Sequence, residues 1–433
     1  MKSKLNVFQR FVRTEALSGV VLLAFAVLAL ALANSPWAPL YTRFWEIQFA
    51  IGSGGHSLSL TLHQWINDGL MALFFLLVGL EIKRELVAGE LSSPRKAALP
   101  IAAAIGGMIV PALLYWSLNT SGPGAAGWGI PMATDIAFAL GALALIAPKA
   151  PVGLKVFLTA LAIVDDMGAV LVIAIFYSNA IAWGALGAAA LIVVFLIGLN
   201  LTGITKLWPY IIAGVALWFF VHESGIHATI AGVALAMTIP TNTRINAAEF
   251  SGEARGLLDR FDRKETGDLL VLTSKGQQET LFSLERASEA ATAPILRLEH
   301  GLHHFSAFVV MPLFAFANAG VQIGGPIVHT GVALGVLAGL VIGKPLGITA
   351  AAFLAVKTGL AKLPEEMGWG ELHGAAWLAG IGFTMSLFIA MLAFQNPEFV
   401  DTAKVAILGG SLLAGAVAAV VLKTLIRREQ SRR

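Results

Sequence analysis

The chain has 433 residues, of which 57% are apolar and only 13% are charged, and its mean hydropathy is +0.79. This composition lies far outside that of soluble globular domains and predicts a protein whose solvent is largely lipid. The sequence contains no cysteine, so disulfides, thiol catalysis and thiolate metal sites are excluded.

Apolar runs of about twenty residues recur along the chain, and each is long enough to cross a hydrocarbon core of about 30 Å as a helix. The first run ends in Ala-Asn-Ser-Pro and is followed by many more, so we interpret it as a retained helix and not as a signal peptide. We expect an all-α integral membrane protein, with residues 1–433 as a single transmembrane domain. The twelve transmembrane helices expected are residues 15–34, 62–82, 97–118, 125–147, 152–177, 182–200, 207–221, 226–240, 293–320, 330–356, 373–395 and 403–425.

The positions of the basic residues predict the orientation, because Lys and Arg collect in short cytoplasmic loops. Placing both termini and alternate loops in the cytoplasm puts all but three of the 29 Lys and Arg residues there or at span ends on that side. Arg43 and Lys404 lie on the opposite side, and Lys344 lies in the middle of the tenth span. We therefore expect a multi-pass protein of the bacterial cell inner membrane with both termini in the cytoplasm.

Two polar segments interrupt the series of spans. Residues 45–61 alternate in hydrophobicity around a glycine turn, which predicts a small external hairpin, with a disordered loop as the alternative. A lone hairpin is marginally stable, so a partner subunit could supply further pairing and give a homodimer. Residues 241–292 are polar and charged, and they predict a cytoplasmic insert that is either a partly helical linker or a regulatory binding element.

Four ionisable residues fall at mid-membrane depth: Asp135 in the fourth span, Asp165 and Asp166 in the fifth, and Lys344 in the tenth. A charge at the centre of a membrane helix costs about 2.5 to 3.5 kcal/mol, so such residues usually face one another or a water-filled cavity and mark a transport path. A buried ion pair that only fixes packing is the alternative, but one lysine cannot neutralise three carboxylates. We therefore expect the site to bind something positively charged.

Sodium ions and protons are the natural candidates, and potassium is a further one. A hard cation prefers oxygen ligands, and both burial and a neighbouring negative charge favour the protonated form of a carboxyl group. If the two ligands exclude each other and only loaded states reorient, exchange follows without a separate coupling device. Adjacent residues point about 100° apart around a helix, so we expect one of Asp165 and Asp166 to bind the cation and the other to pair with Lys344.

Glycine and proline interrupt the fourth and eleventh spans at mid-depth, the fourth just before Thr134 and Asp135. The residues expected to line the two breaks are Gly129, Pro131, Gly382, Thr384 and Ser386. Proline lacks the amide hydrogen that a helix needs, and irregular backbone at this depth survives only where it lines a cavity or packs in protein. By the charge count the two spans run in opposite directions, which predicts inverted repeats of spans three to five and ten to twelve with a binding site at the two discontinuous helices.

Charged residues and histidines gather at the cytoplasmic ends of the second and ninth spans. They are Glu81, Lys83, Arg84, Glu85, Glu299, His300 and His303. Histidine titrates near neutral pH, so protonation here could bias the opening of a cytoplasmic entrance, with solvated charges at helix ends as the alternative. A metal site on the His-x-x-His-His spacing lacks further ligands in the sequence.

Seven stretches of sequence carry a family resemblance over almost the whole chain. They are Phe74-Phe-Leu-Leu-Val-Gly-Leu-Glu-Ile-Lys-Arg-Glu85, Ala133-Thr-Asp-Ile-Ala-Phe-Ala-Leu140, Ile163-Val-Asp-Asp166, Ser224-Gly-Ile-His-Ala-Thr229, Pro312-Leu-Phe-Ala-Phe-Ala-Asn-Ala-Gly320, Gly343-Lys-Pro-Leu-Gly347 and Gly380-Ile-Gly-Phe-Thr-Met-Ser386. In this order they resemble the NhaA-type sodium/proton antiporter family, one of the families on which the rule about broken helices rests. The insert before the ninth span is longer than the loop typical of that family.

The resemblance implies roles for individual residues. The family's paired carboxylates match Asp165 and Asp166, its Thr-Asp at the broken helix matches Thr134 and Asp135, and its membrane lysine matches Lys344. It implies a pH-regulated, electrogenic exchanger that moves more protons in than sodium ions out and becomes active as the cytoplasm turns alkaline. Sodium or lithium would bind at Asp165 and Asp166, the lipid bilayer would surround the protein, and no cofactor is expected.

Two other functions are alternatives to ion exchange. An intramembrane aspartyl protease also needs buried aspartates on separate helices, but neither Asp135 nor Asp165 lies in a Tyr-Asp or Gly-x-Gly-Asp setting, and Lys344 would have no role. Gly343-Lys344 is not a phosphate loop, because Pro345 stands where Ser or Thr is required. We therefore expect neither an enzyme nor a nucleic-acid partner. A sodium-coupled symporter of an organic solute, on a similar inverted-repeat fold, is the more serious alternative.

Overall fold

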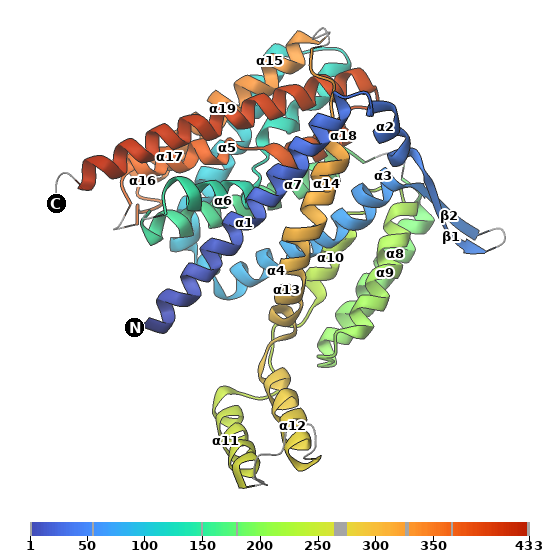
Figure 1. The fold of residues 1–433 in the computed structure, drawn as a ribbon, viewed down its shortest axis with the longest axis vertical. Coiled ribbons are helices and arrows are strands. Elements are labelled where there is room, and N and C mark those ends of the chain that lie inside the picture. The colour runs from blue at the N-terminus through green and yellow to red at the C-terminus, as the bar shows by residue number, and fades with distance from the viewer. Residues whose placement is uncertain are drawn as a thin grey trace.

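The computed structural model describes residues 2–53, 56–148, 150–178, 181–263, 275–324, 329–364 and 367–430. Most of these residues are helical, as the composition predicts (Figure 1). In Figure 1 long helices cross one another to form the body of the molecule, a strand hairpin extends from one side, and two helices project from one end.

The elements follow one another with short connections. The first half of the chain contains α1 (Lys2–Ala33), α2 (Ala38–Glu46), β1 (Gln48–Ser53), β2 (His56–Thr61), α3 (Leu62–Gln64), the π-helix η1 (Trp65–Leu70), α4 (Met71–Ala88), α5 (Pro94–Leu118), the 3-10 helix η3 (Pro123–Met132), α6 (Ile136–Ile146), α7 (Val152–Phe176) and α8 (Trp183–Leu201). The second half contains α9 (Trp208–Glu223), α10 (Ile230–Thr238), α11 (Ala247–Arg263), α12 (Lys275–Ala291), α13 (Pro294–Phe305), the π-helix η5 (Ser306–Val310), α14 (Met311–Asn318), α15 (Thr330–Ala338), the π-helix η6 (Gly339–Gly343), α16 (Lys344–Lys357), α17 (Trp369–Ala379), α18 (Phe383–Ala393) and α19 (Pro397–Gln430).

Within the described residues, seven helices are long and apolar enough to cross a membrane, or up to ten if each of three bent pairs counts as one span. This confirms a mostly helical, multi-pass membrane protein. Two of the twelve predicted spans correspond to α9 and α10, which have 16 and 9 residues. Helices of these lengths extend only about 24 and 14 Å. The count of twelve therefore stays a prediction.

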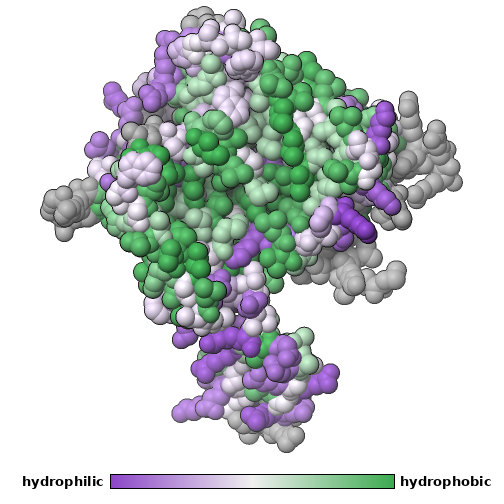
Figure 2. All heavy atoms as spheres, turned by 180° about the vertical axis from the view of Figure 1, so that it is seen from behind, coloured by the Kyte–Doolittle hydropathy of each residue, from purple (hydrophilic) through white to green (hydrophobic). Residues whose placement is uncertain are grey.

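Apolar side chains cover much of the surface of the body. Figure 2 shows apolar atoms spread over the body, with polar atoms gathered at its edges and on the projecting helix pair. Among the exposed side chains are Leu191, Ile212 and Leu412, which are 71%, 64% and 76% exposed. A surface of this kind is stable against lipid tails and would aggregate in water.

Buried apolar side chains form two clusters. The larger cluster includes α5, α7 and the helices from α15 to α19, with Phe314 and Phe388 among its largest members. The smaller cluster joins α4 to α8, α9 and α10 through side chains such as Leu80, Leu196 and Leu217. Helix α4 contributes to both, so it connects the part of the bundle that contains the buried charges with the part that does not.

A hairpin occupies the segment where the alternating pattern predicts one. Strands β1 and β2 pair antiparallel, with Gln48 opposite Thr61, and the turn residues Gly54 and Gly55 lie outside the described residues. Trp65 Nε1 donates to the Phe49 carbonyl at 3.0 Å and fixes the hairpin to the bundle. The external position of the hairpin stays a prediction.

The polar insert contains α11 and α12, which pack against each other, while residues 264–274 lie outside the described residues. The amides of Arg244 and Ile245 donate to the Ala290 carbonyl at 2.9 and 3.3 Å and close the insert at its base. Arg297 donates to the Thr205 carbonyl at 2.9 Å. Arg297 belongs to α13 and also lies 3.7 Å from Glu289 of α12, so it links the second helix of the insert to the loop between α8 and α9. The cytoplasmic position and the regulatory role of the insert stay predictions.

Helices α5 and α16 cross closely because two glycines face each other at the crossing. A Cβ atom at Gly106 would lie 2.9 Å from the carbonyl carbon of Gly347 and closer still to its oxygen. Small residues at such crossings let two membrane helices approach each other. Since α16 begins with Lys344, this crossing also fixes the position of the buried lysine.

Replacing Gly106 with Val should lower the free energy of unfolding by about 1 to 3 kcal/mol, because the added side chain forces α5 away from α16. Gly187→Val in α8 is the matched control, since a Cβ atom there meets nothing within 4 Å. Thermal unfolding of the two variants in detergent measures the difference. Equal midpoints would contradict the close crossing.

Candidate functional site

Two interrupted helices cross in the middle of the bundle. The first consists of η3 and α6, which are bent by 45° at their junction, and the second consists of α17 and α18, which are bent by 46°. Each break exposes backbone groups that a continuous helix would have satisfied. Because lipid offers no hydrogen bonds, these groups need partners within the protein.

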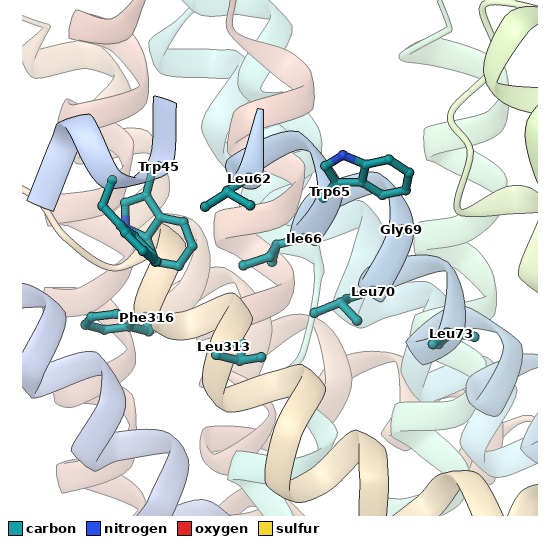
Figure 3. Close-up of a pocket in the computed structure, with 10 residues that line it drawn as sticks. Trp45, Leu62, Trp65, Ile66, Gly69, Leu70, Leu73, Leu313 and Phe316 are labelled. Atoms are coloured by element: carbon teal, nitrogen blue, oxygen red, sulfur yellow. The ribbon is translucent and has the colours of Figure 1, made fainter. Parts of the chain in front are cut away.

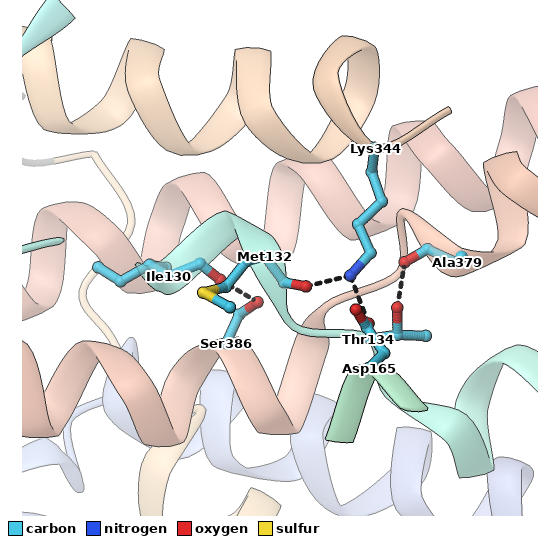
Figure 4. Close-up of polar contacts among 7 residues, drawn as sticks. All are labelled: Ile130, Met132, Thr134, Asp165, Lys344, Ala379 and Ser386. Carbon is cyan, nitrogen blue, oxygen red and sulfur yellow. Dashed lines mark hydrogen bonds and ion pairs between the residues drawn. The ribbon is translucent and has the colours of Figure 1, made fainter. Parts of the chain in front are cut away.

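The two breaks supply each other's partners. The amide of Asp135 donates to the Ile381 carbonyl at 2.8 Å. Thr134 Oγ1 donates to the Ala379 carbonyl at 2.9 Å, as Figure 4 shows. The crossing is thus held by hydrogen bonds between segments about 245 residues apart in the chain.

The other residues predicted to line the breaks lie at the same crossing. Ser386 Oγ donates to the Ile130 carbonyl at 2.8 Å (Figure 4). A Cβ atom at Gly382 would lie 3.1 Å from the Ala133 carbonyl oxygen, so the close approach of the two chains favours glycine there. Gly129 donates its amide to the hydroxyl of Tyr177 at 3.2 Å, and Pro131 packs against Gly339.

The carboxylate of Asp135 caps the first turns of both α6 and α18. Its Oδ1 accepts from the Phe138 amide at 3.0 Å, and its Oδ2 accepts from the amide and the hydroxyl of Thr384 at 3.1 and 2.5 Å. The N-terminus of a helix carries a partial positive charge, so one carboxylate here compensates two helix ends. Both of its oxygens are engaged in this structure.

Lys344 reaches the crossing from the start of α16. Its Nζ donates to the Met132 carbonyl and to Oδ2 of Asp165, the latter at 2.5 Å (Figure 4). Met132 ends η3, where the carbonyls carry partial negative charge. Lys344 and Asp165 are 0% and 2% exposed, and a buried pair of this kind is strongly destabilised when either partner is lost.

Asp165, and not Asp166, makes the ion pair with Lys344. Asp166 is 1% exposed, and the charged groups near enough to act on it through space are Asp165, Glu81, Asp135 and, without a direct ion pair, Lys344. Across the described part of the chain, Oδ1 of Asp165 and Oδ1 of Asp166 are buried and have no hydrogen-bond partner. A buried carboxylate oxygen without a donor needs an explanation, and a bound cation or proton supplies one.

The residues predicted for the cytoplasmic entrance divide into two groups. Arg84 lies 3.3 Å from Glu85 and 3.4 Å from Glu299, so α4 and α13 are joined by an ion-pair network. Lys83 points elsewhere, and its Nζ donates to the carbonyls of Met237 and Ile239 at 2.7 and 2.6 Å, at the end of α10. Lys83 therefore stabilises a helix C-terminus.

The histidines of α13 lie near one another on the helix surface. The His300 and His303 rings are 6.0 and 5.8 Å from the His304 ring. In the ranges that the structure describes, no group of three or more His, Asp or Glu side chains is placed to hold a metal ion. The metal-site hypothesis for these histidines thus has no support.

A groove of about 520 Å³ lies away from the buried charges, between α2, η1 and α14 (Figure 3). Its lining is aromatic and aliphatic, with Trp45, Trp65 and Phe316 prominent, and contains no ionisable side chain. An apolar groove of this kind does not bind a small cation, so it is separate from the candidate ion site.

The geometry defines a class of protein. An apolar helical bundle whose buried charges meet where two interrupted helices cross is typical of a multi-pass membrane transporter. The family model described as "Na+/H+ antiporter 1" matches residues 9–422. The chain belongs to this family, which is one of transporters.

Curated relatives agree with this assignment. The chain is 49% identical over 425 residues to a "Na(+)/H(+) antiporter NhaA" of Oleidesulfovibrio alaskensis, covering 97% of this chain and 94% of the relative. It is 49% identical over 411 residues to a protein of that name from Wolinella succinogenes, covering 94% and 90%. It is 46% identical over 416 residues to "Na(+)/H(+) antiporter NhaA 2" of Helicobacter hepaticus, covering 95% and 94%.

Sequence reasoning missed two supports of the crossing. Ser411 on α19 accepts a hydrogen bond from the Phe383 amide at 3.1 Å and so caps the first turn of α18 together with Asp135. Tyr177, at the end of α7, accepts from the Gly129 amide and donates to the Ala126 carbonyl at 2.8 Å. A lone serine within an apolar helix was the only signal for Ser411.

Replacing Thr384 with Val should destabilise the protein by about 1.5 to 3 kcal/mol, because it removes a hydroxyl donor to the buried carboxylate of Asp135 without changing the shape of the side chain. Thr358→Val is the control, since that hydroxyl donates to the Leu354 carbonyl at an exposed helix end. Thermal unfolding in detergent measures both. If Thr384→Val were no less stable than the control, Asp135 would not depend on this bond.

Proposed function

We propose that the chain is a pH-regulated Na⁺/H⁺ antiporter that exports sodium or lithium in exchange for protons by alternating access. One observation carries the proposal: three carboxylates and one lysine are buried at the crossing, and Oδ1 of Asp165 and of Asp166 has no hydrogen-bond partner among the described residues. The printed names of the relatives, all Na(+)/H(+) antiporters, support the identity of the ions.

Charge compensation assigns a role to each buried acid. Asp135 is compensated by the N-termini of α6 and α18, and Asp165 is compensated by Lys344. Asp166 is the acid left over. We assign it as the principal ligand of the cation, with Asp165 as the second ligand and Thr134 beside it, and no cofactor takes part.

Competition for the same oxygens couples the two ions. A sodium or lithium ion on Asp165 and Asp166 replaces the protons that would otherwise neutralise them, since a hard cation and a proton both bind carboxylate oxygens. Protonation of Asp165 also releases Lys344. Because two carboxylates can each take a proton while the site holds one alkali ion, more than one proton can move inward per ion exported, and the exchange is electrogenic.

The surrounding architecture fits this mechanism. We propose twelve spans with inverted repeats of spans three to five and ten to twelve, supported by the similar bends of the two interrupted helices. The distribution of Lys and Arg supports cytoplasmic termini, and the bacterial relatives support the inner membrane. The hairpin of β1 and β2 offers a strand edge on which a second copy of the chain could pair.

Control by pH is assigned to the ion-pair network at the entrance. Arg84, Glu85 and Glu299 join α4 to α13, and His300 and His303 lie on the same helix as Glu299. Histidine changes charge near neutral pH, so protonation alters the balance of this network. Since α4 also carries Glu81, which interacts with Asp166, the network is connected to the ion site.

Replacing Asp166 with Asn should abolish sodium-driven proton movement, because the amide can neither release a proton nor carry the charge that binds the cation. The assay is proton efflux from proteoliposomes under an imposed pH gradient on addition of sodium or lithium, with no organic solute present. Asp259→Asn, an exposed residue of α11, is the control and should exchange normally. Retained exchange in Asp166→Asn would overturn the assignment, and a need for added solute would indicate a symporter.

Unequal stoichiometry predicts that the membrane potential changes the rate of exchange. With potassium and valinomycin clamping the potential of proteoliposomes, an inside-negative potential should accelerate sodium efflux in exchange for external protons, because net positive charge then moves inward. The measurement is the initial rate of exchange at several clamped potentials. A rate that does not vary with potential would show a neutral, one-for-one exchange.

A further inference from the structure

A histidine outside the ion site joins two of the helices that form it. His373 lies on α17, with its Nδ1 2.9 Å from Thr349 Oγ1 on α16. Its Nε2 accepts a hydrogen bond from Trp377 Nε1, one turn further along α17, at 3.0 Å. All three side chains are half-buried.

The two helices joined in this way hold opposite sides of the ion site. Helix α16 begins with Lys344, which pairs with Asp165. Helix α17 ends at Ala379, whose carbonyl accepts from Thr134. The contact made by His373 therefore fixes the lysine-bearing helix against the helix that supports the crossing.

The bond from Trp377 determines the protonation state of His373. An indole N–H can only donate, so Nε2 of the histidine must present a lone pair. The ring is then neutral, with its proton on Nδ1 facing the hydroxyl of Thr349. A protonated imidazole carries a hydrogen on both nitrogens and cannot accept from Trp377, so protonation breaks this contact.

The charged groups near His373 are few, and two of them have partners of their own. The elements packed against α17 are α6, α7, α16 and α19, and α6 carries no ionisable side chain. At the end of the bundle where α17 begins, the described ionisable side chains of α7, α16 and α19 are Lys155, Lys357 and Lys423, and α17 itself carries Glu371. Glu371 accepts from the Gly368 amide at 2.8 Å, and Lys357 lies over the ring of Phe353.

We propose that His373 is a positioning residue for the exchange: the bond from Trp377 orients its neutral ring toward Thr349 and so holds α16 and α17 in the arrangement that pairs Lys344 with Asp165, and its protonation from the cytoplasm breaks the bond from Trp377, frees the ring to turn away from Thr349 and slows exchange. This inference rests on the proposed antiport function and adds a proton-sensitive contact within the bundle itself. It is separate from the entrance network of Arg84 and Glu299.

Two variants test the proposal from different sides. His373→Gln keeps one acceptor for Trp377 and one donor for Thr349 but cannot be protonated in the working pH range. Trp377→Phe keeps the ring but removes the donor, so protonation of His373 no longer breaks a bond. His329→Gln is the control, because His329 lies 3.7 Å from Glu398 at the other end of the bundle. The readouts are the pH profile of sodium-driven proton efflux and the thermal unfolding midpoint across the same pH series.

His373→Gln should match the unaltered protein at alkaline pH and retain activity and thermal stability as the pH falls. The acid limb of its pH profile should shift toward lower pH by about half a unit, which corresponds to the net free energy of one hydrogen bond. Trp377→Phe should lose the pH dependence of the midpoint that is due to His373 and exchange roughly fivefold more slowly at alkaline pH, because the ring is no longer held toward Thr349. His329→Gln should behave like the unaltered protein.

The outcomes separate the inference from the function on which it rests. If the unaltered protein shows no sodium-driven proton efflux, the antiport function fails, while the thermal midpoints still report on the His373 contact. If the unaltered protein exchanges but His373→Gln has the same acid limb and the same pH-dependent midpoint, the inference is overturned and the antiport function stands. Should His373→Gln fail to fold, an unchanged pH dependence in Trp377→Phe overturns it equally.

Discussion

The structure depends on compensating every charge and every broken helix end that is buried in the bilayer interior. Lipid offers neither hydrogen bonds nor counter-ions, so an interrupted helix at this depth is stable only if its backbone ends meet fixed opposite charges. Asp135 meets two helix N-termini, and Lys344 meets the carbonyl end of η3. Asp135 and Lys344 thus stabilise the crossing of the broken helices, which lipid alone would leave without partners.

Once the broken helix ends are compensated, the crossing keeps an excess of acidic over basic side chains. This excess of negative charge is the feature that suits transport. Lys344 is shared between a backbone carbonyl and Asp165, which leaves Asp166 without a hydrogen-bonded cation. A site that was fully paired would bind nothing, and one with more unpaired acids would not fold. Close helix crossings at Gly106 and Gly382 hold these groups in place.

The buried charged residues of the candidate site could be selected from sequence because their signals are local and rare. A charge in an apolar run, as at Asp135 or Lys344, and a proline before a Thr-Asp pair are each costly enough to indicate function without a fold. The hairpin segment and the helical character of the chain could be predicted because the hydrophobic pattern is also a local signal. Partners across the bundle cannot be read from sequence: neither the bond of Lys83 to the end of α10, nor that of Ser411 to the start of α18, nor that of His373 to α16 could be predicted. The helix within the predicted span 226–240 has only nine residues, α10, because hydropathy records apolar length and not where a helix ends.

The central claim is that sodium and protons compete for one pair of carboxylates, and proton release on binding tests it most directly. Purified protein in weakly buffered detergent solution would be mixed with sodium chloride at constant ionic strength, and the protons released would be counted with a pH indicator. The account predicts release from the unaltered protein, saturating with sodium, and none from Asp166→Asn. Equal release from both proteins, or sodium binding to the unaltered protein without any proton release, would contradict it.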